Sequence, residues 1–265
     1  MKQTESYIKF PDFELYYQLL EKGSHSSEPV LIFLHDSWGC TEMWDDFPEK
    51  MADVFGLNAL AYDRRGHGKS SHFAKEERTK KYLHEASDEL IAVMDKLDIG
   101  QAVLYGHSDG GTIALIAAAM HPERFRGIIV EGAHSFVEEK GKNAVRESRD
   151  KAKTNMLLQV LERFHGEKTE ELFRRWHEAW LSDFFADWTI VPILKNITCP
   201  VLAFRGENDP FDTIEQLNVL ERKIKSPIIA QVISNAEHTP RRENEPATME
   251  LIERFMGKLK AGSSL

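Results

Sequence analysis

Short apolar runs alternate with longer amphipathic stretches along most of the chain. The runs at 30–34, 59–62 and 102–105 contain no charged residue, which is typical of strands that are buried on both faces of a sheet. Between these runs, residues 45–54 and 82–97 carry apolar side chains at helical spacing. Strands that alternate with helices predict a parallel sheet with helices on both faces.

The same alternation extends toward both ends of the chain. A turn at Pro11 and Asp12 separates two short strand-like runs near the start. The further expected elements are strands at 7–10, 13–20, 127–130, 200–204 and 228–233, and helices at 109–120, 213–223 and 246–259.

Residues 135–195 interrupt this pattern. The stretches 145–164 and 169–181 have helical patterning, and the region is rich in charged and large aromatic residues. We therefore predict one α/β core, formed by residues 1–134 and 196–265, with a helical cap inserted at 135–195.

Composition narrows the class of protein. A hydrophobic fraction of 42% over 265 residues suits a folded globular chain. The formal net charge of −9 and the absence of a basic block argue against binding to nucleic acid. With only Cys40 and Cys199 present, no disulfide framework is indicated.

The first ten residues lack a signal-peptide pattern and no apolar run could cross a bilayer, so we expect a cytoplasmic protein without a membrane partner. The oligomeric state stays open.

A serine between glycines is the strongest chemical signal. Gly106-His107-Ser108-Asp109-Gly110 follows an apolar run and precedes a helical one. This order is typical of a nucleophile elbow, a sharp strand-to-helix turn that exposes a serine hydroxyl. Neighbours two residues away must be small for the turn to form. The pattern therefore predicts Ser108 as a nucleophile.

A serine nucleophile needs a histidine base that a carboxylate orients. On an elbow of this kind the chain order is serine, acid, histidine. His238 follows the last expected strand, in a loop at the carboxyl edge of the sheet, and Asp209 follows the strand at 200–204 at the same edge. We predict Ser108, Asp209 and His238 as a catalytic triad, with Glu207 as the reserve acid.

Two backbone N–H groups should form the oxyanion hole. One belongs to Asp109, the residue after the nucleophile, and the other comes from the loop after the strand at 30–34, where we choose Ser37. The neighbouring Asp36 is unexpected, because a carboxylate beside this site could oppose the negative charge that develops there.

Five segments in this order together resemble the α/β-hydrolase superfamily. They are the loop at His35, the Asp-x-Arg-Gly-x-Gly-x-Ser segment at 63–70, the serine elbow, the segment from Gly206 to Asp209, and the loop of His238. The sequence Gly-x-Ser-Asp-Gly-Gly resembles, within that superfamily, the branch that contains valacyclovir-hydrolase-like esterases. The chain departs from the common His-Gly at the first loop, where it has His35-Asp36.

The resemblance implies an α/β-hydrolase fold with a mostly parallel sheet, an inserted cap and a hydrolase that needs neither cofactor nor metal. No His-x-x-x-His pair or acidic cluster in the sequence indicates a metal site. The large aromatic residues near the cap have two interpretations. We assign Trp176 and Trp180 to packing, whereas the candidates for lining a substrate pocket are Trp38, Phe184, Phe185 and Trp188.

These residues predict a serine hydrolase that cleaves a small carboxylic ester through an acyl-enzyme. Two alternatives remain open: a C–C bond hydrolase acting on a ring-cleavage diketone, and a ligand-binding receptor that keeps the fold without catalysis. The Asp109 side chain also has two interpretations. It either pairs with a substrate ammonium or is satisfied internally by Arg64, Arg65 or a loop hydroxyl.

Overall fold

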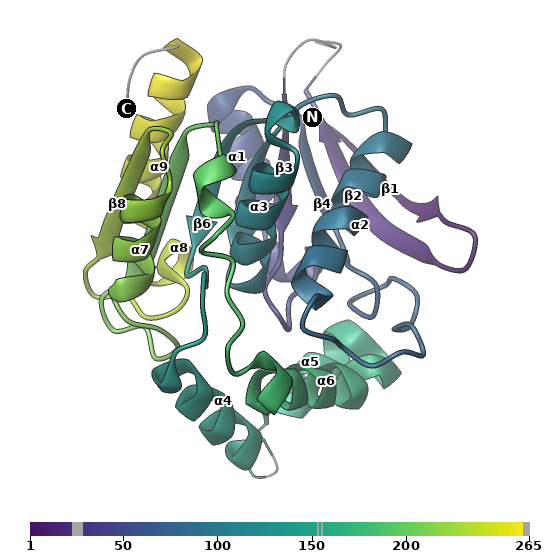
Figure 1. Ribbon diagram of the computed structural model, residues 1–265. Helices are drawn as coiled ribbons and strands as arrows, with labels where there is room; N and C mark the ends of the chain where they lie inside the picture. Colours follow the sequence, from purple (N-terminus) through teal and green to yellow (C-terminus); the bar gives the residue numbers. More distant parts are fainter. Residues whose placement is uncertain (23–28, 153, 155, 262–265) are drawn as a thin grey trace.

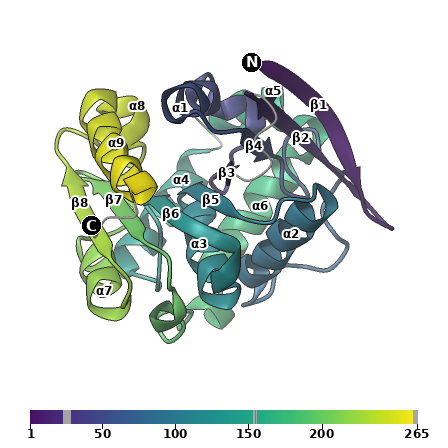
Figure 2. The ribbon, with the colours of Figure 1, turned by 90° about the horizontal axis from the view of Figure 1, so that it is seen from above.

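A computed structural model of the protein describes residues 1–22, 29–152, 154 and 156–261. Its centre is an eight-stranded sheet in the order β1-β2-β4-β3-β5-β6-β7-β8 (Figures 1 and 2). The strands from β4 across to β8 are parallel, and β2 joins them antiparallel to β4. The strands are β1 (Lys2–Lys9), β2 (Glu14–Glu21), β3 (Val30–Leu34), β4 (Ala59–Tyr62), β5 (Ala102–His107), β6 (Phe125–Glu131), β7 (Val201–Gly206) and β8 (Ile228–Ile233).

Helices cover both faces of this sheet, as Figure 2 shows. Apolar side chains of α2 (Tyr82–Lys96), α3 (Asp109–Met120) and α7 (Glu215–Lys223) pack into one hydrophobic cluster. Those of α1 (Phe47–Phe55) and α9 (Glu245–Ala261) pack into a second cluster. Helix α8 (Pro240–Glu243) is a single turn before α9.

Helix α3 lies at the centre of the molecule. Every residue from Asp109 to Ala119 is buried, and the helix has apolar side chains all round rather than on one stripe, as a helix without a solvent face requires. Strand β5, which α3 contacts, is buried at every position. The turn between β5 and α3 is therefore anchored in close-packed core.

Three helices between β6 and β7 lie together beyond the sheet, at the edge where its parallel strands end (Figure 1). They are α4 (Glu139–Lys151), α5 (Leu157–His165) and α6 (Thr169–Leu181). Helix α6 contacts both α4 and α5. These helices fall within the segment that the sequence predicts as a cap.

The prediction of one helix over 145–164 is wrong, because the chain forms α4 and α5 there instead. Helix α4 begins six residues earlier than expected and is mostly solvent-exposed, with only Gly141 and Val145 buried. Its highly charged sequence has too few apolar residues for periodicity to mark its limits. Strand β1 also begins earlier than expected, because an exposed edge strand does not need apolar residues at its polar start.

The remaining expected elements are present with small shifts at their ends. None of the helices in the described part of the chain combines the length and the apolar character that a membrane span requires.

Candidate active site

The turn between β5 and α3 holds Ser108 in an unusual backbone conformation. Its φ of 54° and ψ of −119° are strained for a residue with a side chain. A Cβ at Gly106 would lie 2.3 Å from the carbonyl oxygen of Gly110, and a Cβ at Gly110 would lie 1.9 Å from that of Leu34. Both positions therefore require glycine. The resulting turn has the form of a nucleophile elbow.

His238 and Asp209 form a hydrogen-bonded pair beside this turn. Nδ1 of His238 lies 2.8 Å from Oδ2 of Asp209, which is fully buried. The other carboxylate oxygen of Asp209 accepts a hydrogen bond from the backbone N–H of Phe211 at 2.9 Å. The two residues come from the loops after β7 and β8, which are neighbouring parallel strands.

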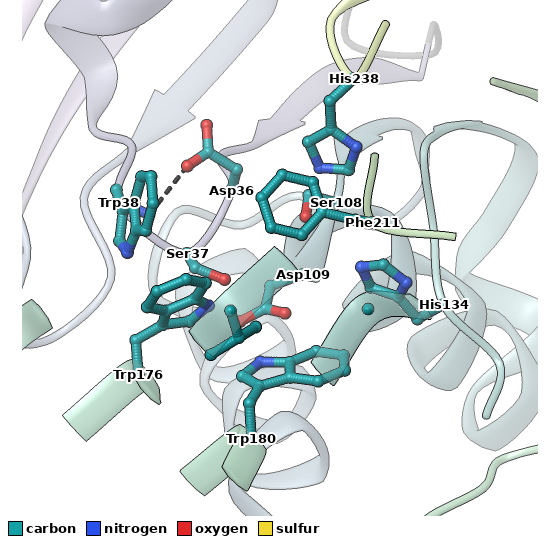
Figure 3. A pocket seen from close by; sticks show the side chains of 12 residues that line it. Asp36, Ser37, Trp38, Ser108, Asp109, His134, Trp176, Trp180, Phe211 and His238 are labelled. Carbon is teal, nitrogen blue, oxygen red and sulfur yellow. Dashed lines mark hydrogen bonds between the residues drawn. The ribbon is translucent and has the colours of Figure 1, made fainter. Parts of the chain in front are cut away.

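Charge and burial act in opposite directions on this pair. Burial would lower the pKa of His238, but the charge and hydrogen bond of Asp209 raise it above its ordinary value of 6.5. Burial would likewise raise the pKa of Asp209, and His238 lowers it. An ionised Asp209 thus stabilises a cationic His238, which a general base becomes during catalysis. Figure 3 shows His238 on the side of the pocket where Ser108 lies.

The backbone N–H groups of Ser37 and Asp109, near Ser108, have no acceptor among the residues that the structure describes. Ser37 follows β3 and Asp109 is the first residue of α3, whose N–H groups have no partner inside the helix. Both residues are buried and line the same cavity as Ser108. Buried donors without acceptors are rare, and this pair lies where the sequence places an oxyanion hole.

Asp36 has partners of its own. Its Oδ1 accepts a hydrogen bond from the backbone N–H of Trp38 at 2.8 Å, and its Oδ2 lies 3.3 Å from Nδ1 of His107. Burial alone would raise the pKa of Asp36, but the hydrogen bond and charge of His107 hold it well below its ordinary value. The Asp36 charge is therefore compensated by its neighbours, which limits its opposition to a developing oxyanion.

The cavity beside Ser108 has a volume of about 70 Å³. Its walls combine the residues of the elbow and the expected triad histidine with side chains from α4 and α6 (Figure 3). The lining residues are Asp36, Ser37, Trp38, Ser108, Asp109, His134, Gly141, Val145, Trp176, Trp180, Phe211 and His238.

Of the four aromatic pocket candidates, Trp38 lines this cavity and the other three lie elsewhere. Phe185 and Trp188 are buried in the hydrophobic core, with their rings stacked 5.0 Å apart, and Phe184 is 43% exposed. Trp176 and Trp180, which the sequence assigns to packing, do line the cavity. Helical spacing indicates that a residue is buried but not what its side chain faces. The sequence pattern therefore could not distinguish aromatic residues that line the cavity from those that pack in the core.

Sequence reasoning also missed His134, Val145 and Phe211 as lining residues. A usable signal existed for two of them. His134 comes soon after β6, and Phe211 comes two residues after Asp209, so both lie in loops at the carboxyl edge of the sheet, where ligands bind in such folds.

The Asp109 side chain is only partly satisfied. Its Oδ2 accepts a hydrogen bond from the Tyr82 hydroxyl at 3.3 Å, and its Oδ1 is buried without a partner among the described residues. Arg64 and Arg65 instead donate to backbone carbonyls. The Arg78 guanidinium lies 4.7 Å over the ring of Tyr82. The Asp109 carboxylate is therefore contacted internally by Tyr82, with the positive charge of Arg78 on the other side of that ring.

Among the residues with described positions, no group of three or more His, Cys, Asp or Glu side chains is placed to hold a metal ion.

The fold and the site together define an α/β protein with a serine elbow at the end of a central parallel strand. A family model described as the alpha/beta hydrolase family matches residues 31–249. The chain belongs to the α/β hydrolase family, and its sheet and helices have the fold that the sequence predicts.

Individual relatives agree with this assignment. The chain is 26% identical over 217 residues to the human serine hydrolase BPHL, covering 78% of this chain and 71% of that one. It is 24% identical to a proline iminopeptidase of Saccharolobus solfataricus, with coverage of 96% and 93%. The solved structure of the enol-lactonase from Burkholderia xenovorans LB400 superposes with a TM-score of 0.71 at 20% identity, covering 95% of this chain and 100% of that one.

Proposed function

We propose that this protein is a serine hydrolase that cleaves a small carboxylic ester through an acyl-enzyme. The observation that carries the proposal is a convergence on one cavity. Ser108, His238 and the residues of the two N–H groups, Ser37 and Asp109, all line it, and Asp209 is hydrogen-bonded to His238 from behind. A protein that only bound a ligand would have no need of buried donors beside a strained serine.

In the proposed reaction, Oγ of Ser108 attacks the acyl carbon while Nε2 of His238 takes the hydroxyl proton. The carbonyl oxygen becomes an oxyanion and accepts hydrogen bonds from the N–H groups of Ser37 and Asp109. His238 then gives the proton to the departing alcohol, and the acyl group stays on Ser108. Water, deprotonated by His238, attacks the acyl-enzyme and releases the acid.

The size of the cavity favours a short acyl group. About 70 Å³ is well below the ~300–1,000 Å³ of typical ligand pockets, and its walls are largely aromatic and aliphatic. The leaving alcohol would then extend toward the cavity mouth. The names of the relatives, which include a serine hydrolase, an iminopeptidase and an enol-lactonase, support hydrolysis at an acyl carbon.

Both cysteines, Cys40 and Cys199, are free and buried in the structure. Unpaired thiols fit a reducing compartment, so we extend the proposal to a cytoplasmic location.

Covalent trapping tests the proposal. A fluorophosphonate probe should add to Ser108, as located by peptide mass mapping, and Ser108→Ala should abolish both labelling and turnover of p-nitrophenyl esters. Labelling at Ser108 without turnover of any ester or amino-acid ester, but with turnover of a ring-cleavage diketone, would support the C–C bond hydrolase instead. A folded protein that the probe does not label would support the receptor.

A further inference from the structure

A second histidine, His134, lines the cavity near His238. His134 follows β6 and is 6% exposed. The Thr112 hydroxyl accepts from its backbone N–H at 3.0 Å and donates to its backbone carbonyl at 2.9 Å. Because Thr112 belongs to the buried helix α3, these two bonds attach the backbone of His134 to the helix that begins at the elbow.

The imidazole of His134 is held by ring contacts rather than by hydrogen bonds. Its centroid lies 5.0 Å from the Trp180 indole in an edge-to-face arrangement and 6.3 Å from the ring of His238. Figure 3 shows it between these two rings, with one nitrogen at the edge that faces Ser108. Neither ring nitrogen has a hydrogen-bond partner among the described residues.

Asp212 approaches the other edge of this ring. Its Oδ2 lies 4.0 Å from Nδ1 of His134 and has no hydrogen-bond partner in the described structure, whereas its Oδ1 accepts from Nε of Arg205. Asp212 is 1% exposed, so this orientation is fixed by the interior. At 4.0 Å the two atoms are not hydrogen-bonded, and burial together with the charge of Asp209 raises the pKa of Asp212 to about 7. In its ionised form, the negative charge of Asp212 favours the His134 tautomer with the proton on Nδ1, which leaves the Nε2 lone pair directed toward the cavity.

The protonation state of His134 agrees with this tautomer. Burial, reinforced by the nearby His238, lowers the pKa of His134 from 6.5 to about 4, so the ring is neutral near pH 7. A neutral imidazole can accept a hydrogen bond, and a cationic one cannot.

The rest of the cavity shows which ligand group would use such an acceptor. The walls formed by Val145, Trp176 and Phe211 are largely apolar. Three other lining residues have buried polar side-chain atoms without a partner among the described residues: Oδ1 of Asp109 is an acceptor, and Nε1 of Trp38 and Nε1 of Trp180 are donors. A hydroxyl group on the ligand is complementary to this mixture, because it can donate to an acceptor such as Nε2 of His134 and accept from an indole N–H.

We infer that His134 determines substrate specificity by accepting a hydrogen bond at Nε2 from a hydroxyl group next to the scissile carbonyl. Asp212 is its positioning residue, because its charge favours one tautomer without contacting substrate. The inference rests on the proposed ester hydrolysis and names the substrate class for it: esters of short 2-hydroxy acids.

Matched substrates test the inference. The p-nitrophenyl ester of a short 2-hydroxy acid is compared with its des-hydroxy analogue for the unmutated protein and for H134F and H134Q. We expect the unmutated protein to prefer the hydroxy ester. H134F should remove this preference by raising KM for the hydroxy ester roughly tenfold more than KM for the des-hydroxy ester, whose own change reports the altered packing of the cavity. H134Q, which keeps an acceptor, should retain part of the preference.

Asp212→Asn provides the test of positioning. It should reduce the preference for the hydroxy ester by less than H134F does, and the des-hydroxy ester measured in parallel reports any effect of the lost charge on His238. Equal kcat/KM for the two esters on the unmutated protein, or an unchanged preference in H134F, would overturn the inference while the proposed ester hydrolysis stood. Equal losses on both esters in H134Q would assign His134 a packing role only. Absence of ester turnover by the unmutated protein would instead overturn the proposed function itself.

Discussion

The carboxylate of Asp209 lies 2.8 Å from Nδ1 of His238, across the ends of two neighbouring parallel strands. Glu207, two residues earlier in the same loop, is exposed, and its side chain accepts a long hydrogen bond of 3.3 Å from the backbone N–H of Asn235. One loop therefore offers an acid inside the site and an acid outside it.

Asp209→Asn should lower kcat roughly 10³–10⁴-fold, because the amide cannot stabilise the histidine cation or fix its tautomer. The matched variant Glu207→Gln should change kcat less than about threefold. Steady-state kinetics on a p-nitrophenyl ester, with circular dichroism to confirm folding, measures both. A larger loss of kcat in the Glu207 variant would show that Glu207, and not Asp209, orients His238.

The pH dependence of activity should report the same pair. Asp209 raises the pKa of His238 above 6.5, and only neutral His238 can take the proton of Ser108. The acidic limb of kcat/KM should therefore have its midpoint above pH 6.5. Asp209→Asn removes the raising charge, leaves the lowering effect of burial, and should shift the midpoint of its residual activity to lower pH. A shift to higher pH would contradict this electrostatic account.

Acyl-length selectivity should depend on Val145 and not on Phe185. Val145 lines the cavity, so Val145→Ala should raise relative kcat/KM for longer acyl chains several-fold. Phe185 is fully buried in the core, so Phe185→Ala should cost about 3–5 kcal/mol of unfolding free energy and leave the selectivity unchanged.

A series of p-nitrophenyl esters and urea denaturation would separate these two effects. The exposed Phe184 supplies the control, because Phe184→Ala should alter neither property. A change of chain-length preference in the Phe185 variant would mean that the cavity reaches farther into the cap than its lining residues indicate.

Acid should weaken the attachment of α5 to the core. Nδ1 of His165 accepts from the Gly68 N–H at 2.8 Å, and its Nε2 donates to the Trp38 carbonyl at 2.7 Å, so only the neutral ring makes both bonds. Burial lowers the pKa of His165 below 6.5, with the Trp38 hydrogen bond acting in the opposite direction. The unfolded chain thus binds the proton first. The stabilisation is complete above pH 6.5 and is lost as the pH falls toward the lower folded-state pKa.

The thermal midpoint should accordingly decline between pH 7.5 and 5. His165→Gln should cost about 1–3 kcal/mol at pH 7.5, because a buried bond is lost, and should make that decline shallower. Part of the decline should remain, because burial also lowers the pKa of His35 and His67. Substitution of the exposed His72 is the matched control. A steeper decline of the thermal midpoint in the His165 variant would contradict this interpretation.

Amine recognition should depend on the Asp109 carboxylate, whose Oδ1 is buried without a partner and whose residue lines the cavity. If a substrate ammonium pairs with it, 2-amino acyl esters should be cleaved roughly 10–100-fold better than des-amino analogues, the range expected for a hydrogen bond to a charged group. Asp109→Ala should remove this preference and keep the backbone donor. Equal kcat/KM for the amino and des-amino pair would show that Tyr82 and the nearby Arg78 already satisfy the carboxylate internally.

The sequence predicted those parts of the protein that local rules determine. Buried strands such as β3 and β4 have uninterrupted apolar runs, and the elbow requires glycines at 106 and 110, so both could be recognised without coordinates. The lining of the cavity could not be recognised, because Trp180 and Phe185 are equally apolar and equally buried. Which of them lines the cavity depends on how the helices between β6 and β7 lie relative to the sheet. The pattern of apolar residues does not encode that placement.

Helix α4 supplies Val145 to the cavity wall, yet almost none of its other side chains is buried. Apart from Lys140, which donates to the Asp209 and Asp212 carbonyls, and Gly141, which lies against Phe211, few of its positions are constrained, whereas substitutions in α3 would disturb the core. Selection can therefore reshape the acyl site through α4 at small cost in stability while the reacting groups stay in register. The cavity wall from α4 can therefore vary more freely than the buried helix α3 beside the nucleophile. To change the substrate range, mutant libraries should be confined to α4.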